Sequence, residues 1–517
     1  MTGLISSSDS VISQHLKHYR ELLSSSSEVL LSEVEDTYLQ LKPLIHFHAA
    51  DPEFDPDGFN YSSSRLPSNI YLTKKIIISS KTDIDPSLFQ IEKTKIVTAE
   101  KRRRLTYFDS NGTLFVLINS YSDLDDLING LLAYRIEYRK IKQQKLYEYP
   151  EILNNTNPEF NPVIQLLPIN ESDFIAQAKT WWLDNINHSL YFQLTQQPVY
   201  FVSSNTHSLA NIIGGFLNLK QNYIFDYVAH NHTRIYDKWF KSKVAHNQTQ
   251  INDFLYHLAQ TFLTKNDQFV EEKAIYEKKL GIITLNALEN LPIDAQIIPL
   301  KAISSSPNPD PNLAGLNLSH LGTSSGVIIN IQYPLGMAAK YLLDAFFELF
   351  PQVRGVYIIG KAAILNGTVG DIQIPDVVLD ETTNNVYQFN NIFNNSFPFK
   401  GVISQILTHQ KSACVYGTLL ENLNQIENYR KSNFNIIEME SGHYLASILE
   451  KFQLKTPISQ SFVYQLQPLP FDFGIINYAS DNPLTENLSK ESLNLSGIET
   501  TYLASLNVLS RIIELDK

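Results

Sequence analysis

The chain has 517 residues, 43% hydrophobic and 18% charged, which is the composition of a globular protein. Asp and Glu outnumber Lys and Arg by 53 to 41, and the formal net charge of −12 argues against nucleic acid as a partner. The single cysteine, Cys414, excludes an internal disulfide and a cysteine metal cluster. The N-terminus lacks a signal-peptide pattern and no apolar run reaches the ~18 residues of a membrane span, so we expect a cytoplasmic protein without a membrane partner.

Residues 1–150 are predicted to form an α+β region. Apolar residues recur at helical spacing between residues 8 and 42, where four consecutive serines interrupt the pattern. The clearest helix spans residues 122–144 and carries acidic residues in its first turn, where the helix dipole favours them. Strand-like runs lie between these helices, at 69–79, 95–99 and 113–119.

Two polar features of this region are expected to have no binding role. The basic run Lys101–Arg104 is typical of a solvated loop or a strand edge. His46 and His48 lie near Asp51, but the sequence offers no convincing third ligand, so we expect no metal site there.

Residues 151–275 are predicted to form a helical/α-β region. Its first part, 150–168, is rich in Asn and Pro and is expected to be a linker or a subdomain boundary. Residues 198–216 predict a buried strand, a polar turn and a helix capped by Ser204 or Asn205.

Residues 276–517 are predicted to form an α/β domain, because short strand-like runs alternate with helical runs from Gly281 onward. One helix is expected at 337–350. The expected strands are 281–285, 296–299, 326–331, 355–359, 371–379, 412–416, 435–438 and 471–478.

Three segments of this last region carry residues suited to a ligand site. Val356–Glu381 is a buried strand that enters a small-residue turn beginning at Gly360 and returns through a Gly-Asp turn. Asn435–Tyr444 is a strand followed by Glu-Met-Glu, whose carboxylates can accept hydrogen bonds from two adjacent hydroxyls. Gly474–Leu484 is a strand that ends in Ser-Asp.

In this order, the three segments resemble the nucleoside phosphorylase/nucleosidase superfamily, over roughly Leu280 to Lys517. The resemblance implies a three-layer α/β domain with a central mixed sheet, and a homo-oligomer that binds a nucleoside or nucleotide without a cofactor or metal. A large region ahead of this domain also occurs in AMP nucleosidases.

The resemblance also implies roles for individual residues. Asp481 would protonate or hydrogen-bond N7 of a purine leaving group, because the base leaves poorly as an anion. Glu440 would bind the ribose hydroxyls, with Met439 packed under the sugar. The other residues expected to contact the substrate are Glu438, Ser480, Gly360, Thr418 and, by stacking on the base, Tyr416.

The sequence departs from the phosphorylase pattern where phosphate would bind. The early loop, Ile331–Met337, is not glycine-rich, and Ile358 stands where an arginine is expected. Lys340 or Lys361 is the available substitute. Water is therefore favoured over phosphate as the nucleophile, and Glu289 is the candidate base for that water.

Three interpretations remain open from the sequence. The chain is a purine nucleosidase acting on a nucleoside or nucleotide, or it is a binding or regulatory protein that keeps the fold without catalysis. The third interpretation assigns the function to residues 1–275 and makes the C-terminal domain a scaffold for oligomerisation.

Overall fold

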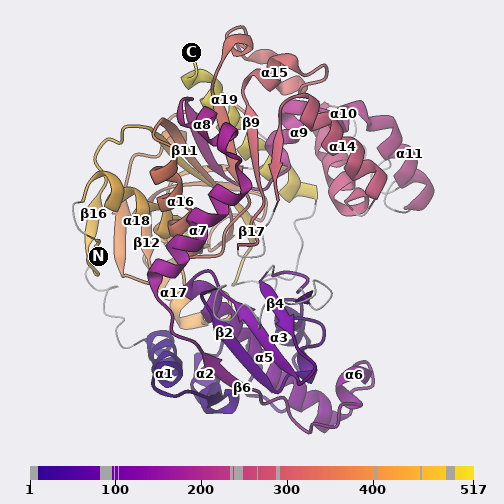
Figure 1. Cartoon of the computed structure of the whole chain (residues 1–517), viewed down its shortest axis with the longest axis vertical. Coiled ribbons are helices and arrows are strands. Elements are labelled where there is room, and N and C mark those ends of the chain that lie inside the picture. The colour runs from indigo at the N-terminus through magenta and orange to yellow at the C-terminus, as the bar shows by residue number, and fades with distance from the viewer. Residues whose placement is uncertain are drawn as a thin grey trace.

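The computed structural model describes residues 10–81, 96–97, 99–102, 104–232, 234, 237, 248–264, 266–286, 291–400, 405–454, 457–484 and 495–517. The chain is a mixed α/β protein, as the sequence predicts, and its strands form two sheets (Figure 1). Among these residues, no helix is both long enough and apolar enough to cross a membrane.

The first sheet lies in the N-terminal part of the chain, drawn in indigo and purple in Figure 1. In spatial order its strands are β1 (Val29–Leu30), β6 (Val163–Leu166), β2 (Lys75–Ser79), β5 (Thr113–Leu117), β4 (Leu105–Phe108) and β3 (Ile96–Val97). Strand β2 pairs in parallel with both of its neighbours, and the other pairings are antiparallel. The helices and short 3₁₀ turns of this part are α1 (Val11–Ser25), η1 (Leu31–Val34), α2 (Glu35–Leu41), η2 (Leu44–His46), α3 (Pro56–Ser63), η3 (Ile70–Leu72), α5 (Tyr121–Gln144) and α6 (Pro150–Leu153).

Helix α5 is the central helix of this part and is buried along most of its length. Ser120 caps its N-terminus by accepting a hydrogen bond from the backbone N–H of Asp123 at 3.1 Å. Lys145 ends the helix in the left-handed conformation, with φ of 56°. The interior of α5 carries charged side chains, so each must find a partner within the fold.

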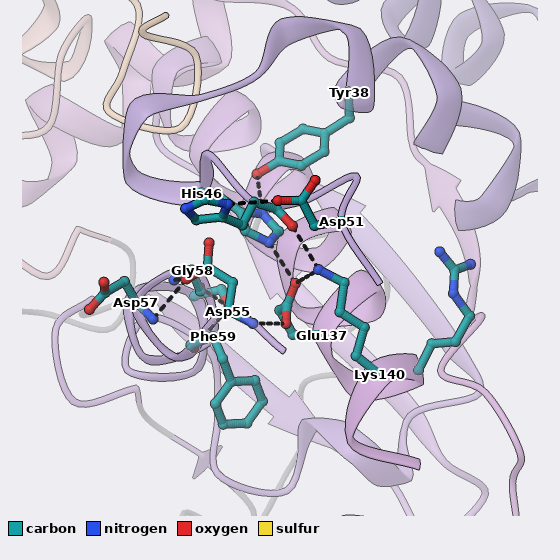
Figure 2. Close-up of polar contacts among 12 residues, drawn as sticks. Tyr38, His46, Asp51, Asp55, Asp57, Gly58, Phe59, Glu137 and Lys140 are labelled. Atoms are coloured by element: carbon teal, nitrogen blue, oxygen red, sulfur yellow. Dashed lines mark hydrogen bonds and ion pairs between the residues drawn. The ribbon is translucent and has the colours of Figure 1, made fainter. Parts of the chain in front are cut away.

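One such charge, Glu137, is at the centre of a buried polar network (Figure 2). Its Oε1 lies 2.8 Å from His46 Nε2 and 2.8 Å from Lys140 Nζ, and its Oε2 accepts a hydrogen bond from the backbone N–H of Asp55 at 2.7 Å. The other ring nitrogen of His46 lies 3.0 Å from the hydroxyl of Tyr38. Both nitrogens of His46 are thus engaged, and the network attaches the segment ahead of α3 to α5.

The second sheet contains eleven strands. Ten form a path in the order β16 (Val463–Gln465), β13 (Asn385–Gln388), β12 (Ile372–Asp380), β14 (Ile406–Cys414), β15 (Ile436–Glu438), β11 (Val353–Ile364), β7 (Val199–Ser203), β10 (Val327–Ile331), β9 (Ala295–Pro299) and β8 (Ile283–Leu285). The eleventh, β17 (Asp472–Asp481), pairs with both β11 and β12. These last two pairings close a circuit of five strands: β11, β17, β12, β14 and β15.

Helices cover both faces of this sheet. Along β7, Val199 and Phe201 belong to one apolar core, and Tyr200 and Val202 belong to the other. The helices and 3₁₀ turns that accompany this sheet are α7 (Glu171–Asn185), α8 (His188–Thr195), α9 (Ser208–Gly214), α15 (Lys301–Ser305), α16 (Ala338–Leu349), α17 (Leu423–Lys431), α18 (Ser441–Phe452), α19 (Leu495–Leu515), η6 (Pro311–Gly315), η7 (Leu321–Thr323) and η8 (Ile392–Asn394).

A group of helices at the right of Figure 1 has a small apolar core of its own. It consists of α10 (Phe216–Leu219), α11 (Gln221–Asn231), α13 (Gln248–Leu258), the π-helical turn η5 (Ala259–Leu263) and α14 (Asp267–Lys279). The N-cap residue of α9 is His207, not Ser204 or Asn205 as predicted, but the side-chain oxygen of Asn205 accepts from the backbone N–H groups of His207 at 3.1 Å and Ser208 at 2.7 Å.

The middle of the chain is divided between the two sheets. Strand β6 falls within residues 150–168, which the sequence predicts to be a linker or a subdomain boundary, and joins the first sheet. Strand β7 falls within the predicted 151–275 region and lies between β10 and β11 of the second sheet. Both strands are short, and their place depends on partners far away in sequence that a local pattern does not reveal.

Hydrogen bonds link the N-terminal part to the second sheet and its helices. Met337 donates its backbone N–H to Ser122 Oγ at 3.0 Å, at the start of α5. Leu44 donates its backbone N–H to the carbonyl of Glu421 at 2.8 Å. Both contacts attach the N-terminal part to loops that follow strands of the second sheet.

Candidate functional site

A cavity of about 440 Å³ lies between the N-terminal part of the chain and the second sheet. The sheet side is formed by β11 and by the carboxyl ends of β15 and β17 with the residues that follow β14, β15 and β17. The predicted site residues that line the cavity are Gly360, Thr418, Glu438, Met439, Glu440, Ser480 and Asp481. These residues come from segments that are up to 121 positions apart, from 360 to 481, and the closed strand circuit brings them together.

Glu440 lies between the end of β15 and the start of α18. Its Oε1 accepts a hydrogen bond from the backbone N–H of Gly336 at 3.2 Å. Burial, together with the neighbouring Glu438 carboxylate, raises the pKa of Glu440 to about 8. Glu440 is therefore largely protonated at neutral pH, and a ligand that needs its carboxylate must bind against this tendency.

Glu438 has a structural role as well as a place in the cavity wall. Its Oε2 accepts hydrogen bonds at 2.8 Å from the backbone N–H groups of both Glu440 and Ser441, at the N-terminus of α18. Its Oε1 accepts from the hydroxyls of Ser441 and Ser412. A carboxylate that caps the helix in this way has little hydrogen-bonding capacity left for a ligand.

Asp481 is the last residue of β17, and it is buried at the cavity. Ser480 Oγ lies 2.6 Å from Asp481 Oδ1 and 3.0 Å from the carbonyl oxygen of Ala362. Ser480 thus joins Asp481 to β11, which defines where the Asp481 carboxylate lies in the cavity wall.

Gly360 lies in β11 next to β17. A Cβ atom at this position would come within 2.6 Å of Asn477 Oδ1, so the absence of a side chain lets the two strands pack. Lys361 follows, is exposed, and also lines the cavity.

The early loop approaches the N-terminal part closely at Gly336. This residue has φ of 53°, and a Cβ atom there would lie 2.4 Å from Ser122 Oγ. Tyr333, from the same loop, lines the cavity, and its hydroxyl lies 3.2 Å from the hydroxyl of Tyr478. Tyr333 is therefore part of the cavity wall.

Two predicted residues are not placed in this cavity. Tyr416 borders a separate depression formed with α1, where it lies near Arg20, and its backbone N–H donates to Glu381 Oε2 at 3.1 Å. Glu289, the predicted base, lies outside the described residues.

Four basic residues of the N-terminal part line the opposite wall: Arg65, Lys101, Arg102 and Arg104. Three of them belong to the compact basic run that the sequence predicts to be a solvated loop or strand edge. Arg104 is instead buried, and Arg102 is half-buried. The sequence shows that these basic residues are clustered. It does not show that the strand edge that carries them lies opposite the second sheet.

Two buried acids, Glu381 and Glu421, lie where the turn after β12 meets the loop after β14. Glu421 lines the cavity, and neither of its carboxylate oxygens has a hydrogen-bond partner among the described residues. Burial raises the pKa of Glu421 well above its ordinary value. Burial and the nearby Asp380 carboxylate also raise the pKa of Glu381, to about 7, although the hydrogen bonds that Glu381 accepts act in the opposite direction.

This acid pair predicts a pH dependence of stability. The unfolded chain releases the Glu381 proton near pH 4.5, whereas the folded chain keeps it until about pH 7, so the free energy of unfolding should fall by up to about 3 kcal/mol as the pH rises through that window. Glu381→Gln should flatten this slope in urea denaturation curves measured between pH 5 and 8. Glu271→Gln, at an exposed position, serves as control, and equal slopes for both variants and the unaltered protein would contradict the prediction.

Asp380, Cys414 and His443 form a buried group whose potential ligand atoms all lie within 4.8 Å of one another. His443 Nε2 has no hydrogen-bond partner among the described residues. The Asp380 carboxylate accepts from the hydroxyls of Thr382 and Thr383, at 2.7 and 2.8 Å. These contacts satisfy Asp380 without a metal ion, although the three residue types can bind one.

Comparison with solved structures finds partial, low-identity likenesses. Uridine phosphorylase from Schistosoma mansoni in complex with uracil is 12% identical, with a TM-score of 0.27, over 36% of this chain and 70% of that chain. The same enzyme in complex with thymine is 9% identical, with a TM-score of 0.34, over 65% of this chain and 92% of that chain. A methylthioadenosine/S-adenosylhomocysteine nucleosidase from Colwellia psychrerythraea 34H, in complex with adenine, is 14% identical, with a TM-score of 0.25, over 37% and 77% of the two chains.

Comparison with curated protein sequences finds no significant match. One family model matches the chain twice, over residues 31–165 and 151–514, and so spans both sheets and both walls of the cavity. The chain therefore belongs to this family, which is described as a family of unknown function (DUF6909).

Proposed function

We propose that the chain binds a nucleoside or nucleotide in the cavity and cleaves its N-glycosidic bond. The observation that carries the proposal is that Glu440 and Asp481, which belong to separate sequence motifs, line one cavity of suitable size. In the proposed reaction Glu440 binds the two ribose hydroxyls and Asp481 donates a proton or a hydrogen bond to N7 of the departing purine.

Water is the proposed nucleophile. The described residues of the early loop contribute Gln332, Tyr333, Pro334 and Leu335 to the cavity, none of which carries a positive charge. The backbone N–H of Gly336 is already donated to Glu440. A phosphate nucleophile would find few donors in this loop, and the cationic side chain on the sheet side of the cavity is Lys361, which lacks the bidentate fork of an arginine.

The first test is release of free base from a panel of purine and pyrimidine nucleosides and their 5′-monophosphates, with and without inorganic phosphate. We expect purine release that phosphate does not accelerate. If nucleosides bind to the protein calorimetrically but no base is released from any of them, the function is binding without catalysis.

The pKa of Glu440 predicts the pH profile of nucleoside binding. Because bidentate binding of ribose hydroxyls needs the ionised carboxylate, the affinity for the nucleoside, measured by calorimetry, should rise with pH and level off above about 8. For one ionisation of this pKa, the ionised fraction grows about fivefold between pH 7 and pH 8. Glu440→Gln should bind the nucleoside weakly and lack this rise, and an unchanged pH profile in that variant would remove Glu440 from the proposed role.

A further inference from the structure

The N-terminal wall of the cavity is positively charged. Arg65 follows α3, and the other three basic residues, Lys101, Arg102 and Arg104, lie just ahead of β4. The backbone N–H of Lys101 donates to the carbonyl of Ser64 at 2.8 Å, which brings the two segments together.

Acidic residues in the first turns of α5 hold two of these arginines in place. Asp126 accepts from Nε and Nη2 of Arg102, both at 2.9 Å, and also from Arg104. Asp123 accepts from Arg104 Nε at 2.5 Å. The carboxylates of Asp123 and Asp126 compensate the charges of Arg102 and Arg104. Of the basic residues described in this wall, Arg65 and Lys101 keep their positive charges uncompensated.

Arg65 is the arginine that these acids leave without a partner. Its guanidinium stacks over the ring of Tyr61, with Cζ 3.4 Å from the ring centroid, and Nη1 donates to the Tyr61 carbonyl at 2.9 Å. Its Nε is buried and has no hydrogen-bond partner, and no ion pair joins Arg65 to a carboxylate among the described residues. Arg65 lines the cavity, and a fixed guanidinium that forms no ion pair with a carboxylate of the described residues is suited to bind an anion.

The opposite wall carries the acidic residues. Arg102 and Glu440 line the same cavity of about 440 Å³, so one ligand can contact both walls. A ligand that fits both walls has hydrogen-bond donors at one end, facing Glu440, and negative charge at the other end, facing Arg65 and Lys101. A ribose that carries a phosphoryl group has this distribution of groups.

We propose that the substrate is a nucleoside phosphate whose phosphoryl group binds to Arg65 and Lys101, with Arg102 behind them. The proposal rests on the proposed function, because it takes the ribose to lie against Glu440. It also gives the N-terminal part of the chain a role in binding, because this part supplies the anion-binding groups that the early loop does not.

The test is calorimetric titration of the full-length protein with ribose 5-phosphate, ribose and inorganic phosphate. We expect ribose 5-phosphate to bind at least tenfold more tightly than either of the other two, because it contacts both walls. Arg65→Gln and Lys101→Gln should each weaken binding of ribose 5-phosphate by about tenfold to a hundredfold, the usual value of charge-assisted hydrogen bonds, and should leave binding of ribose unchanged.

Lys101 is exposed, so its replacement should not disturb folding even if that of Arg65 does. Lys451→Gln, an exposed charge change away from the cavity, is the matched control and should leave all three affinities unchanged. Ribose 5-phosphate binding that is no tighter than ribose, or equally tight in Lys101→Gln and Lys451→Gln, would overturn the proposal.

The outcome is separable from that of the proposed function. Tight, Arg65-dependent binding of ribose 5-phosphate without release of base from any nucleotide would support the phosphoryl site and reject glycosidic cleavage. Release of base from nucleosides with no preference for ribose 5-phosphate would reject the phosphoryl site alone. A third outcome is that inorganic phosphate binds as tightly as ribose 5-phosphate and accelerates base release. The basic wall would then be a site for free phosphate, and the proposal would be overturned.

Discussion

Asp481→Asn is expected to lower kcat for base release by a factor of about 100 or more, the range typical of a lost general acid. Asparagine keeps the size of the side chain and can still hydrogen-bond, but it cannot transfer a proton to the departing purine. Because Ser480 Oγ lies 2.6 Å from Asp481 Oδ1, the asparagine can keep that contact, and the fold should be retained. The measurement is steady-state kinetics with the best substrate found in the nucleoside panel.

The matched control for this variant is Asp376→Asn. Asp376 lies on β12 and pairs with the exposed ring of His409 at 2.7 Å, and it is not part of the cavity wall. The Asp376→Asn variant should have a kcat within about twofold of that of the unaltered protein, because a surface ion pair contributes little. Equal activity of Asp481→Asn and Asp376→Asn would exclude Asp481 as the proton donor.

Glu137→Ala is expected to be the most destabilising single change in the N-terminal part. It removes the carboxylate that His46, Lys140 and the backbone N–H of Asp55 share in the interior of the N-terminal part (Figure 2). Among the residues that the structure describes, the ammonium of Lys140 then keeps the carbonyl of His48, at 2.8 Å, as its partner. Removing one member of a buried ion pair leaves an uncompensated charge, and a loss of about 3–5 kcal/mol in the free energy of unfolding is expected.

Urea denaturation followed by circular dichroism measures this loss, with Glu148→Ala as the control. Glu148 is exposed in the loop before α6, and its removal should change stability by less than about 0.5 kcal/mol. A loss below about 1 kcal/mol in Glu137→Ala would show that the network contributes little to stability. Because α5 also supplies Asp123 and Asp126 to the basic wall, a partly unfolded N-terminal part should lose ribose 5-phosphate binding as well.

The candidate site was predictable from the sequence where its residues belong to continuous motifs. Glu440 and Asp481 each follow or end a buried strand, and the motif around each one is local. Tyr416 lies at the end of a predicted strand beside Thr418, but the turn after β14 directs it toward α1. The role of Arg65 could not be predicted, because no motif surrounds it and its neighbours Arg102 and Arg104 are distant in sequence.

Local sequence patterns were sufficient for much of the secondary structure and for the acidic half of the cavity. Helix periodicity, capping residues and strand alternation depend on neighbours within a few positions, and so the long helix α5 and most strands of the second sheet were found from the chain alone. The tertiary structure decided which sheet β6 and β7 join, and that a basic run on a strand edge faces Glu440 across a cavity. Those arrangements depend on pairing and packing between residues that can lie hundreds of positions apart, which no local pattern contains.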